Sequence, residues 1–235
     1  MLLPMRLGPG ERVCDVAPGD LNAALRDPTL RAIRVAGSHR LLDDLDVAAV
    51  RRDPKPIVGT GGTTFVHLDL QRRCGLAGFH GDHAELSGTE PVVVRGADAV
   101  VCRPGRAEGV LLGGSLAAVR AMIGAGLPDL TGAVLLLTGE RTQGLGQVDR
   151  QLTHLRRAGL LDRVAGVAAG VFTGFDGFAD RGWTLADVLH DHLGRVNVPV
   201  LTGLPVGPGR AAIPVGTRAV LDTAGRTLTV AAGVA

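Results

Sequence analysis

The stretch Pro56–Leu70, PIVGTGGTTFVHLDL, decides the fold of this chain. Apolar Ile57 and Val58 predict a short buried strand, which the glycine-rich turn Gly59–Gly62 brings to an end. Apolar residues then recur at helical spacing, which predicts a helix from Thr63 to about Cys74. The stretch is therefore expected to form a strand, a tight turn and a helix in direct succession.

A turn of this kind presents backbone N–H groups and the positive end of a helix dipole, a geometry that suits a carboxylate or a phosphate. In hydrolases built this way, the residue at the tip is a serine or cysteine activated by a base. Here the tip is Gly61, flanked by Thr60 and Gly62. A bare glycine turn is explained equally well by structural packing, so both interpretations stay open.

Working outward from this turn, strand and helix patterns alternate along the chain, which predicts an α/β fold. We expect a trimmed Rossmann-like N-terminal layer over residues 1–85 and a β-rich C-terminal domain with helices over residues 86–235, with a cleft between them. Strands are expected at 12–17, 32–36, 133–137, 164–172 and 198–202, helices at 20–25, 41–52, 115–123, 148–158 and 185–193, and a hairpin at 219–222 and 227–230.

The composition excludes several classes of protein. A net charge of +2 with scattered positive residues does not favour nucleic acid as a partner. Three widely spaced cysteines predict neither a disulfide framework nor a zinc site. The beginning lacks a signal-peptide pattern, and no apolar run reaches the ~20 residues that span a membrane. We expect a cytoplasmic protein with no membrane partner and no metal.

Several stretches, taken in order, resemble the LD-carboxypeptidase family. These serine peptidases include the muramoyltetrapeptide carboxypeptidases and the microcin C self-immunity peptidases. The likeness covers nearly the whole chain, and its stretches together are specific. They are LNAALRDPTLRAIR (21–34), DVAAVRRDPKPIVGTGGTTFVHL (46–68), Phe79-His80-Gly81, GRAEGVLLGGSL (105–116), DRQLTHLRRAGLLDRVAGVAAGVFTG (149–174) and 203–216.

The chain departs from the family at the positions that carry its chemistry. The family's serine aligns with Gly61, and its histidine, in a Gly-His-Gly sequence, aligns with Pro208. Its glutamate is absent or shifted, because Thr138-Gly139-Glu140 stands at that place. Glycine cannot attack a carbonyl and proline cannot accept a proton, so the resemblance implies that ordinary serine-peptidase chemistry has been lost.

Three residues are candidates for catalysis. Glu140 follows a buried strand where this fold opens its cleft, so it is a candidate acid or base, although a solvated glutamate is the alternative. Thr60 and Thr63 are candidates for a displaced nucleophile. Alternatively, Thr63 caps the helix that follows it, and Thr60 shapes the turn.

The histidines have plain structural interpretations beside the functional ones. His80, Asp82 and His83 have residue types that suit a metal, but a loop hydrogen-bonding role for His80 is favoured. His67 is expected to be packed, whereas His190 and His192 are expected to be solvated.

The candidate ligand-binding residues come from the glycine turns and the matched stretches. They are Gly37, Gly59, Gly61, Gly62, His80, Arg106, Gly113 and Gly114. We also expect Arg106 to pair with Glu108 across the domain junction.

Three functions remain open. In the first, the protein binds a peptide or aminoacyl-type small molecule in the interdomain cleft, with a possible non-peptidase step in specialised metabolism and no cofactor. In the second, it is a peptidase or amidase with displaced residues. In the third, it is a structural or regulatory subunit. The resemblance also implies a homodimer.

Overall fold

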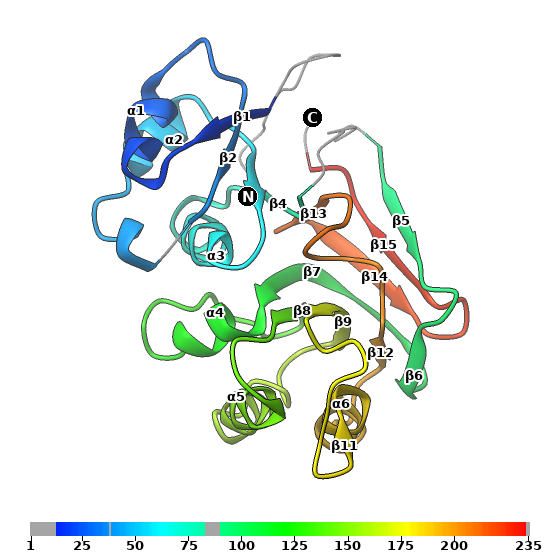
Figure 1. Cartoon of the computed structure of the whole chain (residues 1–235). Coiled ribbons are helices and arrows are strands. Elements are labelled where there is room, and N and C mark those ends of the chain that lie inside the picture. The colour runs from blue at the N-terminus through cyan, green and yellow to red at the C-terminus, as the bar shows by residue number, and fades with distance from the viewer. Residues whose placement is uncertain (1–12, 38, 83–89, 234–235) are drawn as a thin grey trace.

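The computed structural model describes residues 13–37, 39–82 and 90–233, which form two sheets with helices packed around them (Figure 1). The first sheet has the order β1-β2-β3-β4-β13. Its first four strands are parallel, and β13 pairs antiparallel with β4 although it comes from far along the chain. These strands are β1 (Val13–Val16), β2 (Ala32–Val35), β3 (Ile57–Gly59), β4 (Gly78–His80) and β13 (Ile213–Val215).

The second sheet has the order β5-β15-β14-β7-β8-β9-β12-β6. Strands β7, β8, β9 and β12 form its parallel centre, and the remaining strands pair antiparallel. Its strands are β5 (Val92–Arg95), β6 (Val100–Arg103), β7 (Arg106–Ser115), β8 (Val134–Glu140), β9 (Gly166–Thr173), β12 (Val200–Thr202), β14 (Arg218–Asp222) and β15 (Thr227–Val230). A separate short hairpin joins β10 (Ala179–Asp180) to β11 (Trp183–Thr184).

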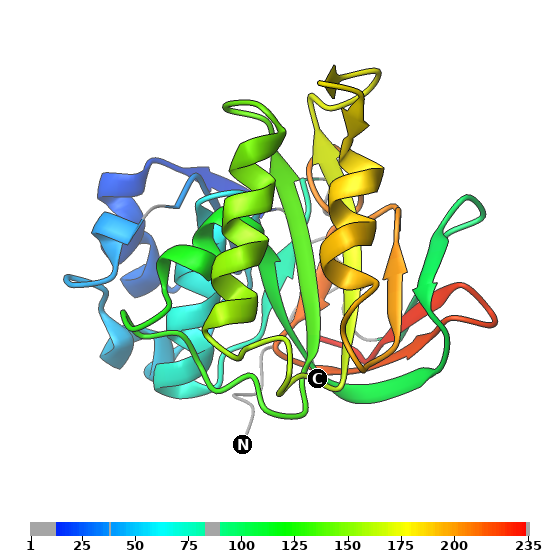
Figure 2. The same ribbon diagram turned by 90° about the horizontal axis from the view of Figure 1, so that it is seen from below.

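Helices α4 (Leu116–Ala121), α5 (Leu145–Arg157) and α6 (Leu185–Leu193) cover one face of the second sheet. Figure 2 shows α5 and α6 side by side across β8 and β9. They bury a core of leucines and valines that includes Leu135, Leu152 and Val167, each almost inaccessible to solvent. Burial of a side chain of this size stabilises a fold by roughly 2 kcal/mol, so this layer anchors the C-terminal half.

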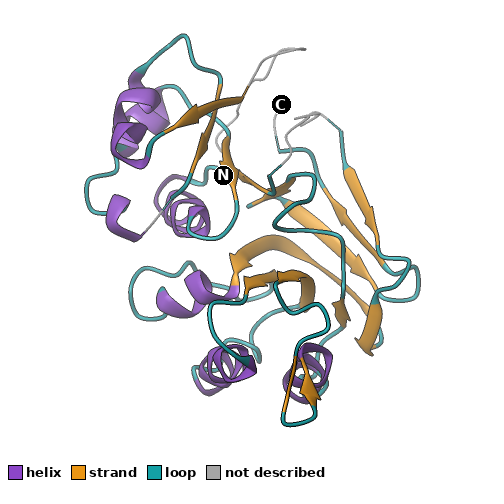
Figure 3. Cartoon of the chain, viewed as in Figure 1, coloured by secondary structure: helices purple, strands orange, loops and turns teal. Residues whose placement is uncertain are grey.

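Helix α3 (Thr63–Cys74) lies between the two sheets (Figures 1 and 3). It packs against β3 and β4 on one side and against β7 and α4 on the other. It ends at Gly75, whose φ of 67° is the left-handed C-cap conformation that glycine adopts without strain. The turn that begins α3 is therefore fixed relative to both sheets.

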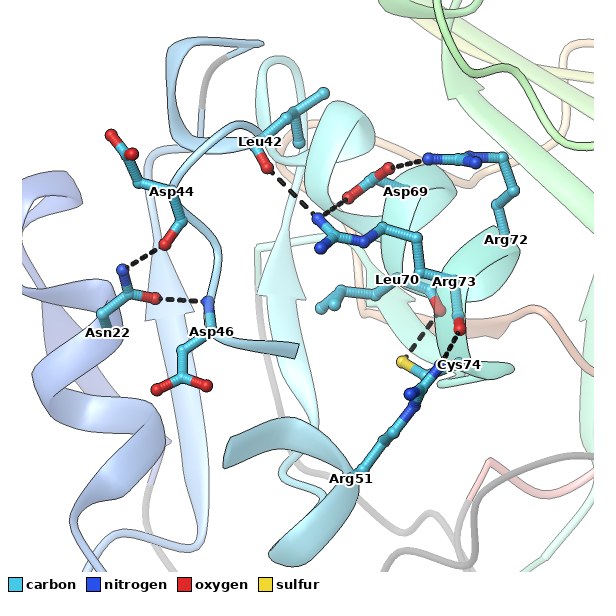
Figure 4. A network of polar contacts seen from close by, with 10 residues as sticks. All are labelled: Asn22, Leu42, Asp44, Asp46, Arg51, Asp69, Leu70, Arg72, Arg73 and Cys74. Atoms are coloured by element: carbon cyan, nitrogen blue, oxygen red, sulfur yellow. Dashed lines mark hydrogen bonds and ion pairs between the residues drawn. The ribbon is translucent and has the colours of Figure 1, made fainter. Parts of the chain in front are cut away.

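A polar network ties α3 to the segment before α2 (Val47–Arg52) (Figure 4). Buried Asp69 accepts hydrogen bonds from Arg72 at 2.9 Å and from Arg73 at 3.1 Å. Arg73 also donates to the carbonyl of Leu42, and Arg51 donates to the carbonyl of Arg73. Beside this network lies a hollow of about 580 Å³. The two arginines that line it, Arg72 and Arg73, are already paired with Asp69.

The α/β fold class predicted from the sequence is confirmed, and α3 and α6 have the predicted bounds. The helix predicted over 41–52 is wrong in its first half. Leu41 ends a short 3-10 helix (η2, His39–Leu41), and α2 (Val47–Arg52) begins only after Asp46. The Asp46 carboxylate accepts the N–H of Ala49, so this N-cap sets where α2 starts.

Two shorter helical segments complete the N-terminal part: η1 (Pro18–Asp20) and α1 (Leu21–Arg26). Within the described residues, no helix combines the length and the hydropathy needed to cross a membrane. The three cysteines are free thiols and are partly exposed.

Candidate functional site

The turn after β3 carries an open glycine at its tip. Gly61 has φ +54°, and a Cβ added to it would meet no atom within 4 Å. Gly59 differs, because a Cβ there would stand 2.5 Å from Thr63 Oγ1. Gly59 is thus required for packing, whereas Gly61 has room for a side chain in a backbone conformation that glycine favours.

Thr63 is buried and holds a neighbouring segment in place. Its hydroxyl donates to the carbonyl of Val35 at 2.6 Å and accepts the N–H of Gly37 at 3.3 Å. Gly37 lies so close that an added Cβ would come within 2.8 Å of Thr63 Cα. The prediction that Thr63 caps α3 is wrong, because the N-cap residue is Gly62 and Thr63 is the first residue of the helix.

A cleft of about 190 Å³ opens in front of this turn. It is lined by residues from the turn, the ends of β7 and β8, the loop after β8, helices α4 and α5, β9 and the loop before β13. The lining residues are Thr60, Gly61, Ser115, Ala117, Thr138, Gly139, Glu140, Thr142, Gln147, Val148, Gln151, Phe172 and Pro208. The fold therefore brings Thr60, Gly61, Glu140 and Pro208 to one place.

Asp82 joins two walls of this cleft. Its Oδ1 accepts the hydroxyl of Thr60 at 3.0 Å, and its Oδ2 accepts the N–H of Gly209 at 2.6 Å. The carboxylate thus links the turn after β3 to the turn that contains Pro208. His83, named with Asp82 as a possible metal ligand, lies outside the described residues. The residues that are described contain no group of three or more side chains suited to a metal.

At the end of β8, Gly139 is tightly packed and Glu140 is exposed to solvent. A Cβ added to Gly139 would stand 2.3 Å from the ring of Phe172, so that ring occupies the space of a side chain at 139. Glu140 is exposed at the rim of the cleft, and its carbonyl accepts a hydrogen bond from Gln147. The guanidinium of Arg141 lies 4.3 Å from the centre of the Phe178 ring.

Beneath the cleft, His80 is fully buried in β4. Its Nε2 lies 3.0 Å from the hydroxyl of Thr138, a residue of the cleft lining. Burial, with a smaller contribution from nearby His67, lowers the pKa of His80 to about 3. His67 is packed as expected, with Nε2 2.9 Å from the carbonyl of Ile57, and burial lowers its pKa to about 4.

Other predicted ligand-binding residues lie apart from the lining. Gly113 and Gly114 lie within β7. A Cβ added to Gly113 would collide with the carbonyl oxygen of Leu136, and one added to Gly114 would collide with Thr64. Arg106 lies at the opposite end of β7 and is exposed.

Two predictions about charged side chains are wrong. Glu108 pairs with Arg218, its diagonal neighbour on strand β14, instead of with Arg106. His190 is exposed as expected, but His192 is buried and its Nε2 lies 2.8 Å from Asp149. Residues two apart on a helix face different directions, and His192 faces α5.

Sequence reasoning missed Ser115, Thr138 and Gln151, which all line the cleft. A signal existed for Ser115, because it directly follows the glycine pair of a stretch already matched. Thr138 stands in the stretch that aligns with the family's glutamate but was not predicted as a site residue, and no local signal marked Gln151.

Together, the two sheets and the cleft define an α/β protein in which a glycine turn at a helix N-terminus faces strand ends of a second sheet. Family models describe the same two parts: the LD-carboxypeptidase N-terminal domain matches residues 17–81 and the LD-carboxypeptidase C-terminal domain matches residues 108–221. A carboxypeptidase predicted in Streptomyces coelicolor is 35% identical over 238 residues, covering 89% of this chain and 74% of that protein. The chain therefore belongs to the LD-carboxypeptidase family.

Solved structures agree on the fold. The microcin C7 self-immunity protein MccF, in complex with glutamyl sulfamoyl guanosine, matches with a TM-score of 0.77 at 19% identity, over 91% of this chain and 79% of that one. The muramoyltetrapeptide carboxypeptidase of Oxalobacter formigenes matches with a TM-score of 0.75 at 24% identity, over 91% and 81%. At these identities the likeness establishes the architecture.

Proposed function

We propose that this protein binds a small aminoacyl or peptide ligand in the cleft in front of Gly61 and does not cleave it by serine-peptidase chemistry. The observation that carries the proposal is that Gly61 and Pro208 lie at the same cleft. Both line the cleft, and the resemblance places the family's serine and histidine at these positions. The cleft is present, but its lining has neither a nucleophile at the tip of the turn nor an imidazole.

The chemistry of the lining supports loss of catalysis. Glu140 is the single ionisable side chain among the described residues that line the cleft. The hydroxyl of Ser115 has no hydrogen-bond partner among them, so no base activates it. A carboxylate alone is a poor substitute for the imidazole that takes the proton in serine hydrolases.

The backbone of the turn supports retained binding. The N–H groups of Gly61 and Gly62 donate to no acceptor among the described residues, and they stand at the N-terminus of the 12-residue helix α3. Such groups attract a carboxylate or a carbonyl oxygen. The cleft volume of about 190 Å³ equals roughly six water molecules, which suits an aminoacyl group better than a long peptide.

The solved relatives point to the same ligand class. MccF structures contain glutamyl sulfamoyl guanosine and aspartyl sulfamoyl adenosine, which are aminoacyl compounds. By analogy, we expect the cleft of this chain to hold the aminoacyl part of such a ligand. A homodimer and a non-peptidase step remain predictions.

A second candidate function rests on a different contact. Thr60 donates its hydroxyl to the carboxylate of Asp82, so a hydroxyl lies within reach of a weak base at the cleft. A threonine hydrolase would use this pair. We favour binding because both oxygens of Asp82 are already engaged, the second by the N–H of Gly209.

Binding is tested by calorimetric titration with three probes: an LD-dipeptide, an aminoacyl amide and glutamyl sulfamoyl guanosine. Ala117→Trp places a large side chain at an exposed position of the cleft wall, and Ala186→Trp is the matched control on the exposed face of α6. We expect saturable binding of at least one probe to the wild type and the control, weakened at least tenfold in Ala117→Trp. Equal binding to both variants, or none to the wild type, would contradict the proposal.

A further inference from the structure

His80 and Thr138 form a buried pair beneath the cleft. His80 lies in β4 of the first sheet and Thr138 in β8 of the second, so the pair spans the junction between the sheets. His80 is fully inaccessible to solvent, and its Nε2 stands 3.0 Å from Thr138 Oγ1. Its other ring nitrogen, Nδ1, is buried without a hydrogen-bond partner.

The unpartnered nitrogen indicates where the ring proton sits. Burial keeps the ring neutral near pH 7, since it lowers the pKa of His80 to about 3. A neutral ring carries one N–H. A buried N–H without an acceptor is rarer in proteins than an unsatisfied acceptor, so the proton belongs on Nε2 and the lone pair on Nδ1. In this tautomer Nε2–H donates to Thr138 Oγ1.

The hydroxyl of Thr138 then has a hydrogen to give. Its methyl group is held against the backbone of Gly170 and Gly207, where an added Cβ would come within 3.1 and 2.9 Å of Thr138 Cγ2. Packing on that side directs Oγ1 toward His80. Among the described residues, Oγ1 has no partner other than His80. Thr138 is 1% exposed, so it meets the cleft only at its floor.

We propose that His80 is a positioning residue: it donates to Thr138 and so leaves the Thr138 hydroxyl to donate to an acceptor oxygen of the bound ligand. The ligand class is thereby narrowed to molecules that place a carboxylate or carbonyl oxygen at the floor of the cleft. This inference rests on the proposed binding function. It gives a role to His80, whose side chain does not itself reach the cleft lining.

The tautomer is tested without any ligand. Two-bond ¹H–¹⁵N NMR correlations of histidine rings distinguish Nε2–H from Nδ1–H and from the charged ring, and a His80→Gln variant assigns the signal. We expect the Nε2–H form of His80 throughout about pH 5 to 8, because the folded pKa lies well below this range. An Nδ1–H ring or an imidazolium in this range would overturn the inference.

The donor role is tested with the same probes and two variants. Thr138→Val removes the hydroxyl and keeps the methyl packing, whereas Thr138→Ser keeps the hydroxyl. The probe that binds the wild type best is used for both variants. We expect Thr138→Val to bind it roughly tenfold more weakly, the loss typical of one hydrogen bond, and Thr138→Ser to bind it with wild-type affinity. Folding of each variant is checked by thermal unfolding.

The outcomes separate the two proposals. If no probe binds the wild type, the proposed function fails, and the NMR measurement alone decides the tautomer. If probes bind the wild type and Thr138→Val equally well, the donor role fails while the binding function stands.

Discussion

Placing a serine at the tip of the turn tests two parts of the proposal: that the turn accepts a side chain at position 61, and that the cleft lacks a base. In Gly61→Ser, the new side chain projects into open space, since a Cβ at 61 meets nothing within 4 Å. The loss in free energy of unfolding comes only from the left-handed backbone at φ +54°, and it is roughly 1–2 kcal/mol for a residue with a Cβ. The matched variant Gly59→Ser drives its Cβ to 2.5 Å from Thr63 Oγ1, so it should cost more than about 3 kcal/mol.

The assay is urea unfolding of the wild type and both variants, followed by incubation of Gly61→Ser with an LD-dipeptide. We expect Gly61→Ser to fold and to remain inactive, because Pro208 supplies no base and Phe172 fills the space beside Gly139. Equal destabilisation by the two variants would refute the geometry of the turn. Hydrolysis by Gly61→Ser would refute the argument that the base has been lost.

Three further predictions concern stability. Burial lowers the folded pKa of His80 to about 3 and that of His67 to about 4, so below about pH 6.5 the unfolded chain binds more protons than the folded one. The free energy of unfolding should therefore fall on acidification, by about 2 kcal/mol per histidine at pH 5. Equal free energies of unfolding in urea at pH 7.5 and pH 5 would contradict this. Gly114→Ala pushes a Cβ to 2.6 Å from Thr64 Oγ1 and 3.0 Å from the His80 ring, so it should cost about 3 kcal/mol. Gly124→Ala, whose Cβ is unobstructed, should cost about 1 kcal/mol, and equal losses in thermal melts would count against the prediction. Lys55 is 1% exposed and its Nζ donates to the carbonyl of Leu25, so Lys55→Ala empties a buried site and should cost about 3 kcal/mol in urea unfolding. A loss under about 1 kcal/mol would be inconsistent with that burial.

The sequence predicted elements whose signals are local. Helix α3 follows directly from the glycine turn and the apolar spacing after it, and α6 is bounded by Thr184, which forms a capping box with Asp187. Strands β4 and β13 were not predicted. Each has three residues, and their pairing joins segments more than a hundred residues apart, which no local pattern reveals.

Part of the candidate site was predictable for the same reason. Thr60, Gly61 and Glu140 flank a strand end or a glycine turn, and the structure places all of them at the cleft. Thr138 gains its significance from His80, which reaches it only because β4 of one sheet lies beside β8 of the other. This contact depends on tertiary packing, which the sequence around Thr138 does not reveal.

Whether the protein binds without hydrolysis is decided by a mass-spectrometric incubation of the purified wild type with LD-peptides and aminoacyl amides, beside Thr60→Ala and Glu140→Ala. We expect every peptide and amide to remain intact in all three samples, because no activated nucleophile faces the cleft. Hydrolysis by the wild type that disappears in Thr60→Ala would contradict the account and would identify the Thr60–Asp82 pair as a relocated catalytic site.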